Sequence, residues 1–279
     1  MPKYIQPFGF IVVRCIGALI LFWLSSTLFI KEKTDRKDIP RFMLVAIFGI
    51  AINQTMFLKG LSITTPINAS ILMIASPIIV MTITTLVLKE KLSWNKTAGI
   101  SLGVVGVMLL ITKPDFSTLQ ATQNSSFTKE TLSGDVFILI NALSWGLYLV
   151  YVKGLMQKYN TFTIMKWMFL FGLLYVLPYS YEEFSAIEWS AFTPDIWWKT
   201  AFVVIGVTFF TYLLNTYALR SLSPTIAGIY IYLQPFFASL IAIYSGKDKL
   251  DMIKVIAAVL IAAGVYLVSK PTLSKTKSL

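Results

Sequence analysis

The chain has 279 residues, of which 56% are apolar and 13% are charged. Soluble domains carry about a quarter of charged residues, so this balance excludes an ordinary soluble domain and indicates the lipid bilayer as the main solvent. The formal net charge of +11 lies in short Lys and Arg clusters between apolar runs. That pattern is typical of membrane topology and does not indicate a nucleic-acid partner.

Several kinds of chemistry are missing from the sequence. Histidine is absent, which removes the usual general base and metal ligand of membrane hydrolases. Cys15 is the single cysteine, so no intrachain disulfide can form. No GxxxxGK[ST] pattern occurs, which argues against ATP-driven transport by this chain. We therefore predict no enzyme activity, no cofactor and no metal site.

Apolar stretches recur along the chain at about the length needed to cross a bilayer, roughly 20 residues. They predict an all-α polytopic membrane protein with nine transmembrane helices. In chain order, these are expected at residues 8–30, 42–58, 67–88, 97–112, 135–152, 164–181, 198–219, 225–245 and 253–269. The shortest, 97–112, needs its end residues to snorkel or the bilayer to thin locally.

The loops predict an orientation. If the first helix runs from outside to inside, fifteen Lys and Arg fall in inner loops, eight in outer segments, and Arg14 within a span. By the positive-inside rule, the N-terminus is outer and the C-terminus cytoplasmic, in a cell (plasma) membrane. The outer segments 113–134 and 182–195 are predicted as solvated loops, with short amphipathic caps as the alternative.

An internal repeat appears at an offset of 158 residues, the distance from Pro66 to Pro224. It matches the second to fourth spans with the seventh to ninth. Five crossings separate the two triplets, so they face opposite ways in the membrane, as in the inverted repeats of secondary transporters. The matching residues are Pro66 and Pro224, Ala69 and Ala227, Pro77 and Pro235, 89–92 and 247–250, and 106–107 and 264–265.

Completing this symmetry pairs the sixth span with the first and leaves the fifth, 135–152, without a partner. We therefore expect one further helix before Met1, in a five-plus-five arrangement with both termini inside. The predicted organisation is a first repeat at 1–112, an outer loop at 113–134, a second repeat at 135–269 and a basic cytoplasmic tail at 270–279.

Four segments carry a resemblance to a known family. They are PFGFIVVR from Pro7, INASILMIASPIIVMTITTLVLKEKLS from Ile67, GDVFILINALSWGLYLVYVK from Gly134 and IAGIYIYLQPFFASLIAIYSGKDKL from Ile226. In this order they resemble the EamA-type transporters of the drug/metabolite transporter superfamily. The resemblance implies two inverted five-helix halves and a central cavity formed by the second, third, fifth, seventh and eighth spans. The family's first helix is absent, and Asp248, with a shifted Gly246, replaces the usual Gly-Glu of the second half.

The repeat also selects polar residues at matching depths. Asn53 corresponds to Thr211, and Ser76 corresponds to Gln234. Polar groups within a span are costly unless they find partners, so they often line a transport pathway. The alternative, that they only bond between helices, is equally consistent with the sequence.

Helical spacing extends this set. Residues three, four or seven positions apart lie on one face of a helix. This spacing groups Asn141, Trp145 and Tyr148 in the fifth span, Thr211 and Asn215 in the seventh, and Tyr230 and Gln234 in the eighth. Such faces predict an apolar, aromatic cavity with sparse polar groups, suited to a small amphiphilic metabolite. Packing alone remains the alternative for Trp145 and Tyr148. The predicted substrate-binding residues are Asn53, Ser76, Asn141, Trp145, Tyr148, Thr211, Asn215, Tyr230 and Gln234.

Three further residues have predicted roles. Pro77 and Pro235 remove a backbone donor within a span, so each predicts a kink that is either a hinge or static packing. Arg14 lies near the outer end of the first span, where its long side chain can snorkel to the headgroups. We expect Arg14 to have a structural or gating role.

The sequence therefore predicts a secondary transporter that exports small organic metabolites, amino-acid-like or otherwise amphiphilic, by alternating access. Its partners are the small-molecule substrate and the lipid bilayer; a homodimer remains open. No Asp or Glu falls in the middle of a span, so ion coupling is undetermined. The alternatives are a lipid-linked or nucleotide-sugar substrate, a non-transporting helix bundle, or an inactive truncated protein.

Overall fold

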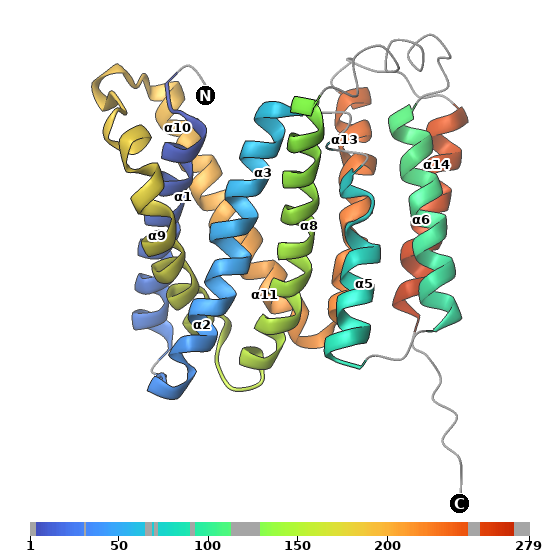
Figure 1. Cartoon of the computed structure of the whole chain (residues 1–279), viewed down its shortest axis with the longest axis horizontal. Coiled ribbons are helices and arrows are strands. Elements are labelled where there is room, and N and C mark those ends of the chain that lie inside the picture. The colour runs from blue at the N-terminus through green and yellow to red at the C-terminus, as the bar shows by residue number, and fades with distance from the viewer. Residues whose placement is uncertain are drawn as a thin grey trace, which may run out of the picture.

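The computed structural model describes residues 4–30, 32–64, 69, 72–89, 93–112, 129–244 and 252–270. Helices form nearly all of this part of the chain and stand side by side (Figure 1). Segments η2 and η4 are π-helices, segments η1, η3 and η5 are 3-10 helices, and all others are α-helices. The bounds, in chain order, are α1 Pro7–Phe29, η1 Arg36–Asp38, α2 Ile39–Ala46, η2 Ile47–Ala51, α3 Ile52–Ile63, α5 Ser76–Val87, α6 Trp94–Thr112, α8 Lys129–Met156, α9 Thr161–Ser185, η3 Trp189–Ala191, α10 Pro194–Phe202, η4 Val203–Phe210, α11 Thr211–Ser221, α12 Pro224–Ile229, η5 Tyr230–Tyr232, α13 Leu233–Tyr244 and α14 Met252–Ser269.

Several helical segments are suited to a bilayer. Within the described residues, five are long and apolar enough to cross a membrane: Pro7–Phe29, Arg36–Ile63, Leu132–Met156, Thr161–Ser185 and Pro194–Ser221. Two shorter apolar helices, Ser76–Val87 and Val255–Ser269, accompany them. Each of the nine predicted spans overlaps a helix of the structure. The chain is therefore an all-helical, multi-pass membrane protein.

The ends of the helices differ from the sequence prediction. Helix α8 begins at Lys129, inside the segment 113–134 expected to be a loop; the rest of that loop, 113–128, lies outside the described residues. The segment 182–195 is also not simply solvated. Its buried Ile187 and Phe192 pack against the start of α1, which makes this segment a folded cap on the upper edge in Figure 1.

A carboxylate joins this cap to α1. Glu183 Oε2 accepts hydrogen bonds from the backbone N–H groups of Phe8 (2.7 Å) and Gly9 (3.0 Å). The first N–H groups of a helix have no partner within it, and the helix dipole favours a negative charge there. Glu183, in the last turn of α9, therefore holds the N-terminus of α1, a role that the loop prediction did not include.

The opposite, lower edge is held by a buried acid. Asp38, 5% exposed, accepts hydrogen bonds from Tyr159 Oη (2.6 Å) and Lys158 Nζ (2.5 Å). Arg220 Nη2 donates to the carbonyl of Tyr159 (2.6 Å), which brings the end of α11 into the same network. The bond to Asp38 raises the pKa of Lys158 above its usual value. One charged cluster thus joins the α1–α2 and α8–α9 connections to α11.

Two helices are interrupted before a proline. Helix α5 begins at Ser76, after a turn at 74–75, so Pro77 lies in its first turn rather than in mid-helix. In the second half, the 3-10 segment η5 precedes α13, whose bounds include Pro235. Each of the two predicted spans is therefore interrupted just before its proline, and the hinge role of the prolines stays a prediction. Proline fits the first turn because its missing N–H has no intrahelical partner there.

The two π-helical segments, η2 and η4, lie at positions about 158 residues apart. A π-helix leaves backbone carbonyls without their usual i+4 donors. In η2, Ser144 Oγ donates to the carbonyl of Phe48 (2.6 Å), and Tyr212 Oη donates to that of Gly49 (3.1 Å). In η4, Thr208 Oγ1 donates to the carbonyl five residues earlier (2.9 Å). Side chains thus stabilise both wide turns.

Residues 158 positions apart also contact each other directly. Gln54 Nε2 donates to Tyr212 Oη (3.3 Å), and Tyr232 Oη donates to the carbonyl of Ile74 (2.7 Å). Figure 1 shows α2–α3 running from the lower to the upper edge and α10–α11 running the opposite way. The two segments α2–α3 and α10–α11, which the 158-residue offset matches, therefore run in opposite directions and contact each other at equivalent residues.

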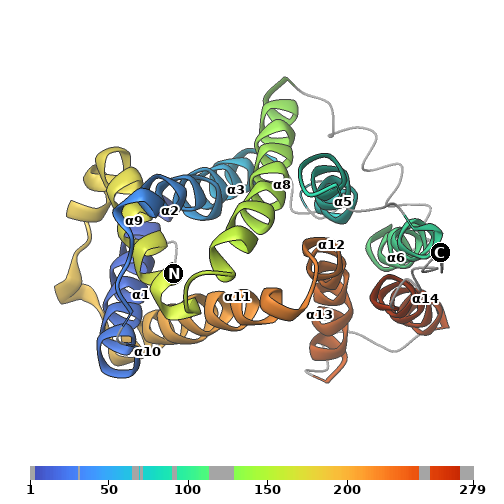
Figure 2. The same ribbon diagram turned by 90° about the horizontal axis from the view of Figure 1, so that it is seen from below.

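The pair α6–α14 packs through glycine at the far end of the molecule (Figure 2). A Cβ on Gly264 would lie 2.5 Å from the carbonyl oxygen of Gly99, and one on Gly106 would lie 2.9 Å from that of Ala257. These two contacts exchange under the 158-residue offset. Close backbone approach at small residues is a common way for helices to associate in membranes.

We expect Gly264→Ala to lower the stability of the protein by about 1–3 kcal/mol, because the new methyl group meets backbone that cannot move aside. Thermal unfolding in detergent measures this. The control is Gly154→Ala, since a Cβ there meets no atom within 4 Å. Alanine is the better helix former, so the control variant should be equally or more stable. Equal unfolding temperatures for the two variants would contradict the packing argument.

Candidate functional site

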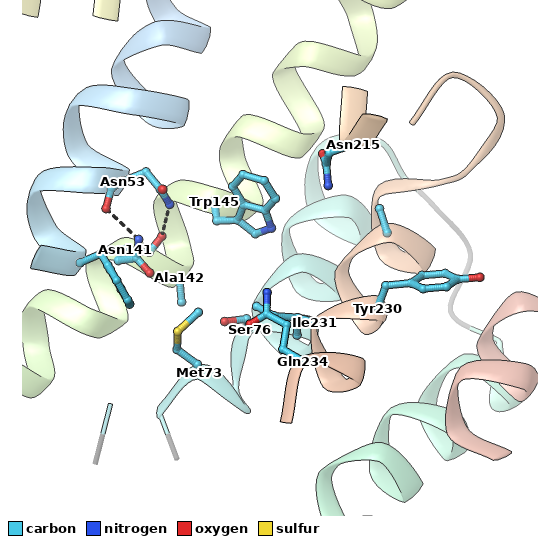
Figure 3. A pocket seen from close by; sticks show the side chains of 12 residues that line it. Asn53, Met73, Ser76, Asn141, Ala142, Trp145, Asn215, Tyr230, Ile231 and Gln234 are labelled. Carbon is cyan, nitrogen blue, oxygen red and sulfur yellow. Dashed lines mark hydrogen bonds between the residues drawn. The ribbon is translucent and has the colours of Figure 1, made fainter. Parts of the chain in front are cut away.

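A cavity of about 330 Å³ lies between helices that are far apart in the sequence. Its wall is formed by residues of α3, α5, α8, α11, α12, η5 and α13 and by Met73 (Figure 3). Its lining residues are Asn53, Phe57, Met73, Ser76, Asn141, Ala142, Trp145, Asn215, Ala227, Tyr230, Ile231 and Gln234. Among these described residues there is no Asp, Glu, Lys or Arg.

The structure brings most of the sequence-predicted residues together in this cavity. Seven of the nine lie in its wall, namely Asn53, Ser76, Asn141, Trp145, Asn215, Tyr230 and Gln234. The other two, Tyr148 and Thr211, do not. Thr211 is exposed, and its Oγ1 donates to the carbonyl of Gly206 (3.3 Å) in η4. Thr211 therefore occupies the position that matches Asn53 in the repeat, but its side chain does not line the cavity as that of Asn53 does.

Tyr148 lies behind the wall. Its side chain is fully buried, its hydroxyl lies 3.1 Å from Thr216 Oγ1, and its ring lies 5.0 Å from that of Trp145. A Cβ on Gly49 would meet the same ring, so η2 packs directly against it. Tyr148 therefore supports Trp145 from the side away from the cavity, which is the packing alternative weighed from the sequence.

Two asparagines join α3 to α8 at the cavity wall. Asn141 Nδ2 donates to the carbonyl of Asn53 (2.8 Å), and Asn53 Nδ2 donates to the carbonyl of Asn141 (3.3 Å), as Figure 3 shows. Both amide nitrogens are thus used, while neither Oδ1 accepts a hydrogen bond from another described residue. The pair fixes the two helices and leaves its acceptor oxygens for a ligand.

Two other polar atoms of the wall have no partner. Ser76 Oγ and Asn215 Oδ1 are buried and make no hydrogen bond within the described part of the chain. Burial without a partner costs about 1–3 kcal/mol per group, so such atoms require an explanation in the structure. Both lie in the wall of the cavity, where a bound molecule can supply the partner.

Sequence reasoning missed five wall residues, all apolar: Phe57, Met73, Ala142, Ala227 and Ile231. The 158-residue offset relates three of them to other wall residues. Phe57 corresponds to Asn215, Met73 to Ile231. A search for polar pairs could not find these positions, because one or both members of each pair are apolar.

Below the cavity, α5 closes against α12 and α8. Thr84 and Thr225 lie with their hydroxyls 2.8 Å apart, and both side chains are fully buried. A Cβ on Gly228 would lie 3.1 Å from Val80, and one on Gly146 would lie 2.7 Å from Ile83. This closing layer, formed by Val80, Ile83, Thr84, Gly146, Thr225 and Gly228, separates the cavity from the lower edge.

Two of the residues predicted as hinges or gates, Pro77 and Arg14, are not part of the wall. Pro77 is buried one residue after Ser76, and the side chain of Pro235 is outside the described part. Arg14 was expected to reach toward the headgroups, but its Nε donates to Thr208 Oγ1 in η4 (2.9 Å). Thr208 in turn donates to a π-helical carbonyl, so Arg14 stabilises the wide turn of η4.

We expect Asn141→Ala to lower the stability of the protein by about 1 kcal/mol, because it removes a bond between α3 and α8. Asn215→Ala is the matched control in the same wall, since it removes an amide whose Oδ1 has no partner and should leave stability unchanged. Thermal unfolding in detergent compares the two variants. An equal loss in both would mean that the reciprocal bonds do not hold the helices together.

Comparisons with known proteins agree with this architecture. The model of the EamA-like transporter family matches residues 1–112 and 132–270. An uncharacterized transporter of Archaeoglobus fulgidus is 27% identical over 270 residues, covering 95% of this chain and 88% of the relative. The uncharacterized transporter YyaM of Bacillus subtilis is 23% identical over 253 residues, covering 91% of this chain and 80% of the relative.

Similarity extends to plants and to a solved structure. The Arabidopsis thaliana protein WALLS ARE THIN 1 is 23% identical over 290 residues, covering 93% of this chain and 74% of that protein. One crystal structure superposes with a TM-score of 0.75 at 15% identity, covering 95% of this chain and 88% of the other, which shows a shared fold. With the family model matching most of its length, this chain belongs to the EamA-like transporter family.

Proposed function

We propose that this transporter moves a small organic metabolite, with an apolar body and a few hydrogen-bonding groups, out of the cell as a secondary transporter. The observation that carries the proposal is the cavity itself. It combines carboxamides, an indole and apolar side chains, and it lies between helices of both halves of the chain. Concave, mostly apolar sites with a few placed polar groups are typical of small-molecule recognition.

The lining narrows the class of solute. Trp145, Phe57 and Met73 offer aromatic and apolar surface, while the amides of Asn53, Asn141, Asn215 and Gln234 offer hydrogen bonds without fixed charge. A nucleotide-sugar or lipid-linked phosphate would require cations around its phosphates. The described lining supplies none, which favours a neutral or zwitterionic metabolite such as an amino-acid-like compound.

The mechanism we propose is alternating access between two inverted halves. The antiparallel course of α2–α3 and α10–α11, and the direct contacts between residues 158 apart, support this arrangement. In the present conformation the closing layer around Thr84 and Thr225 blocks the lower side of the cavity. If each half adopted the helix packing that the other half now has, the lower side of the cavity would open and the upper side would close.

We infer that the lower edge in Figure 1 faces the cytoplasm of a cell membrane. The ends of helices gathered there carry many of the cations of the chain, including Arg36, Lys37, Arg41, Lys153, Lys158 and Arg220. Cationic loops are retained on the cytoplasmic side during insertion. The C-terminus then lies inside, and release of solute is outward.

Replacing Trp145 or Gln234 by alanine should reduce the efflux of accumulated metabolites at least about tenfold, which corresponds to about 1.4 kcal/mol of lost contact. Efflux from cells loaded with labelled metabolite mixtures measures this at matched expression. The control is Trp198→Ala, because Trp198 is 72% exposed on α10. Unchanged efflux in both cavity variants would refute the site.

Reporter fusions test the orientation. Green fluorescent protein fused to the C-terminus should fluoresce, and alkaline phosphatase at the same point should stay inactive, because that end is expected in the cytoplasm. As the matched control, alkaline phosphatase inserted after Glu188 in the folded cap should be active, since the cap lies at the opposite edge. The reverse pattern would show that the molecule is inserted the other way.

A further inference from the structure

The N-terminus of helix α5 opens into the cavity. Met73 precedes the helix, Ser76 is its first residue, and both lie in the wall. The helix has 12 residues, long enough for its dipole to place a partial positive charge of about half an elementary unit at this end. The cavity thus contains an electropositive point although its described lining has no Lys or Arg.

Two backbone donors at this end of α5 have no acceptor among the described residues. The first hydrogen bond into the helix runs from the Ile79 N–H to the carbonyl of Ala75 (3.0 Å). Pro77 has no N–H, and the N–H groups of Ser76 and Ile78 donate to no carbonyl of the described residues. The usual acceptor for Ile78, the carbonyl of Ile74, instead accepts a hydrogen bond from Tyr232 Oη (2.7 Å).

A side chain independently marks the same point. Ser76 is 2% exposed, and its Oγ has no hydrogen-bond partner within the described part of the chain. Figure 3 shows Ser76 beside Gln234 in the middle of the lining residues, with Trp145 above them. Within the described residues, a buried hydroxyl and two N–H groups without partners therefore belong to the same end of α5, at the cavity wall.

We propose that this place, the α5 N-terminus with Ser76 Oγ and the Gln234 amide, is the subsite that binds a carboxylate group of the transported solute. The inference rests on the proposed function and adds the chemical group that the site selects. N–H groups and the dipole at a helix N-terminus bind anions, and a carboxylate accepts the bonds that these donors offer.

The number of donors favours a singly charged group. A phosphate dianion is normally held by Arg or Lys in addition to backbone donors, and neither lines the described wall. Across the cavity, Asn53 and Asn141 present free Oδ1 atoms, which suit a donor such as an ammonium group. The site therefore matches a solute with a carboxylate at one end, a donor at the other and an apolar body between.

Binding to the purified full-length chain in detergent tests the proposal, using calorimetric titration with two matched pairs of probes. The pairs are L-leucine with L-leucinamide, and L-phenylalanine with L-phenylalaninamide, which differ only in the carboxylate. The variants are Ser76→Ala, which removes the hydroxyl, and Ser76→Asp, which places an anion in the subsite. An Asp in the first turn suits the helix dipole, so the fold should be retained.

We expect at least one amino acid to bind about tenfold more tightly than its amide. Ser76→Ala should remove about tenfold of affinity for the acid, as expected for a lost hydrogen bond to a charged group, with little change for the amide. Ser76→Asp should abolish binding of the acid and retain that of the amide. Ser26→Ala is the control, because it also removes a buried hydroxyl without a partner, but on α1 and outside the cavity wall.

Equal affinity for acids and amides, or acid affinity unaffected by both Ser76 variants, would overturn the subsite, as would a lack of binding by all four probes. The efflux assay separates this failure from that of the proposed function. If efflux of labelled metabolites still depends on Trp145, the chain is a transporter with a different selectivity. If no efflux depends on the cavity, the proposed function itself fails.

Discussion

The constraint on which the whole structure depends is that backbone N–H and C=O groups within a bilayer need partners inside the protein. Several departures from regular helix in the described part are met by specific side chains. Ser144 and Tyr212 donate to carbonyls of η2, Thr208 to one of η4, and Tyr232 to the carbonyl before the break at α5. The α5 N–H groups that have no acceptor among the described residues belong to the helix end that lines the cavity, where irregular backbone is tolerated in membranes.

Much of this arrangement was predictable because period and repetition are properties of the sequence. Apolar runs indicated the helices, and the 158-residue offset selected Ser76 and Gln234, which lie together in the wall. Helical spacing was less selective. The spacing predicted that Tyr148 shares a face with Asn141 and Trp145. Tyr148 lies two helical turns beyond Asn141, however, and at that level the face of α8 is buried in the core against η2.

The remaining features depend on contacts between segments distant in sequence. The segment 182–195 folds because Ile187 and Phe192 find the start of α1, and no local pattern encodes that meeting. The π-helices likewise need donors from other helices, such as Ser144 for η2. The sequence predicted a structural or gating role for Arg14 but not its partner, because Thr208 lies 194 residues away in the chain.

The contacts between residues 158 apart have a consequence for how a molecule can lie in the cavity. Positions around it match under the 158-residue offset, but the side chains differ: Ser76 corresponds to Gln234, Phe57 to Asn215, and Met73 to Ile231. The two halves of the chain therefore present different side chains to the cavity. Under the proposed alternating access, a bound solute therefore has a single preferred orientation, and it need not turn over when the two halves exchange their packing.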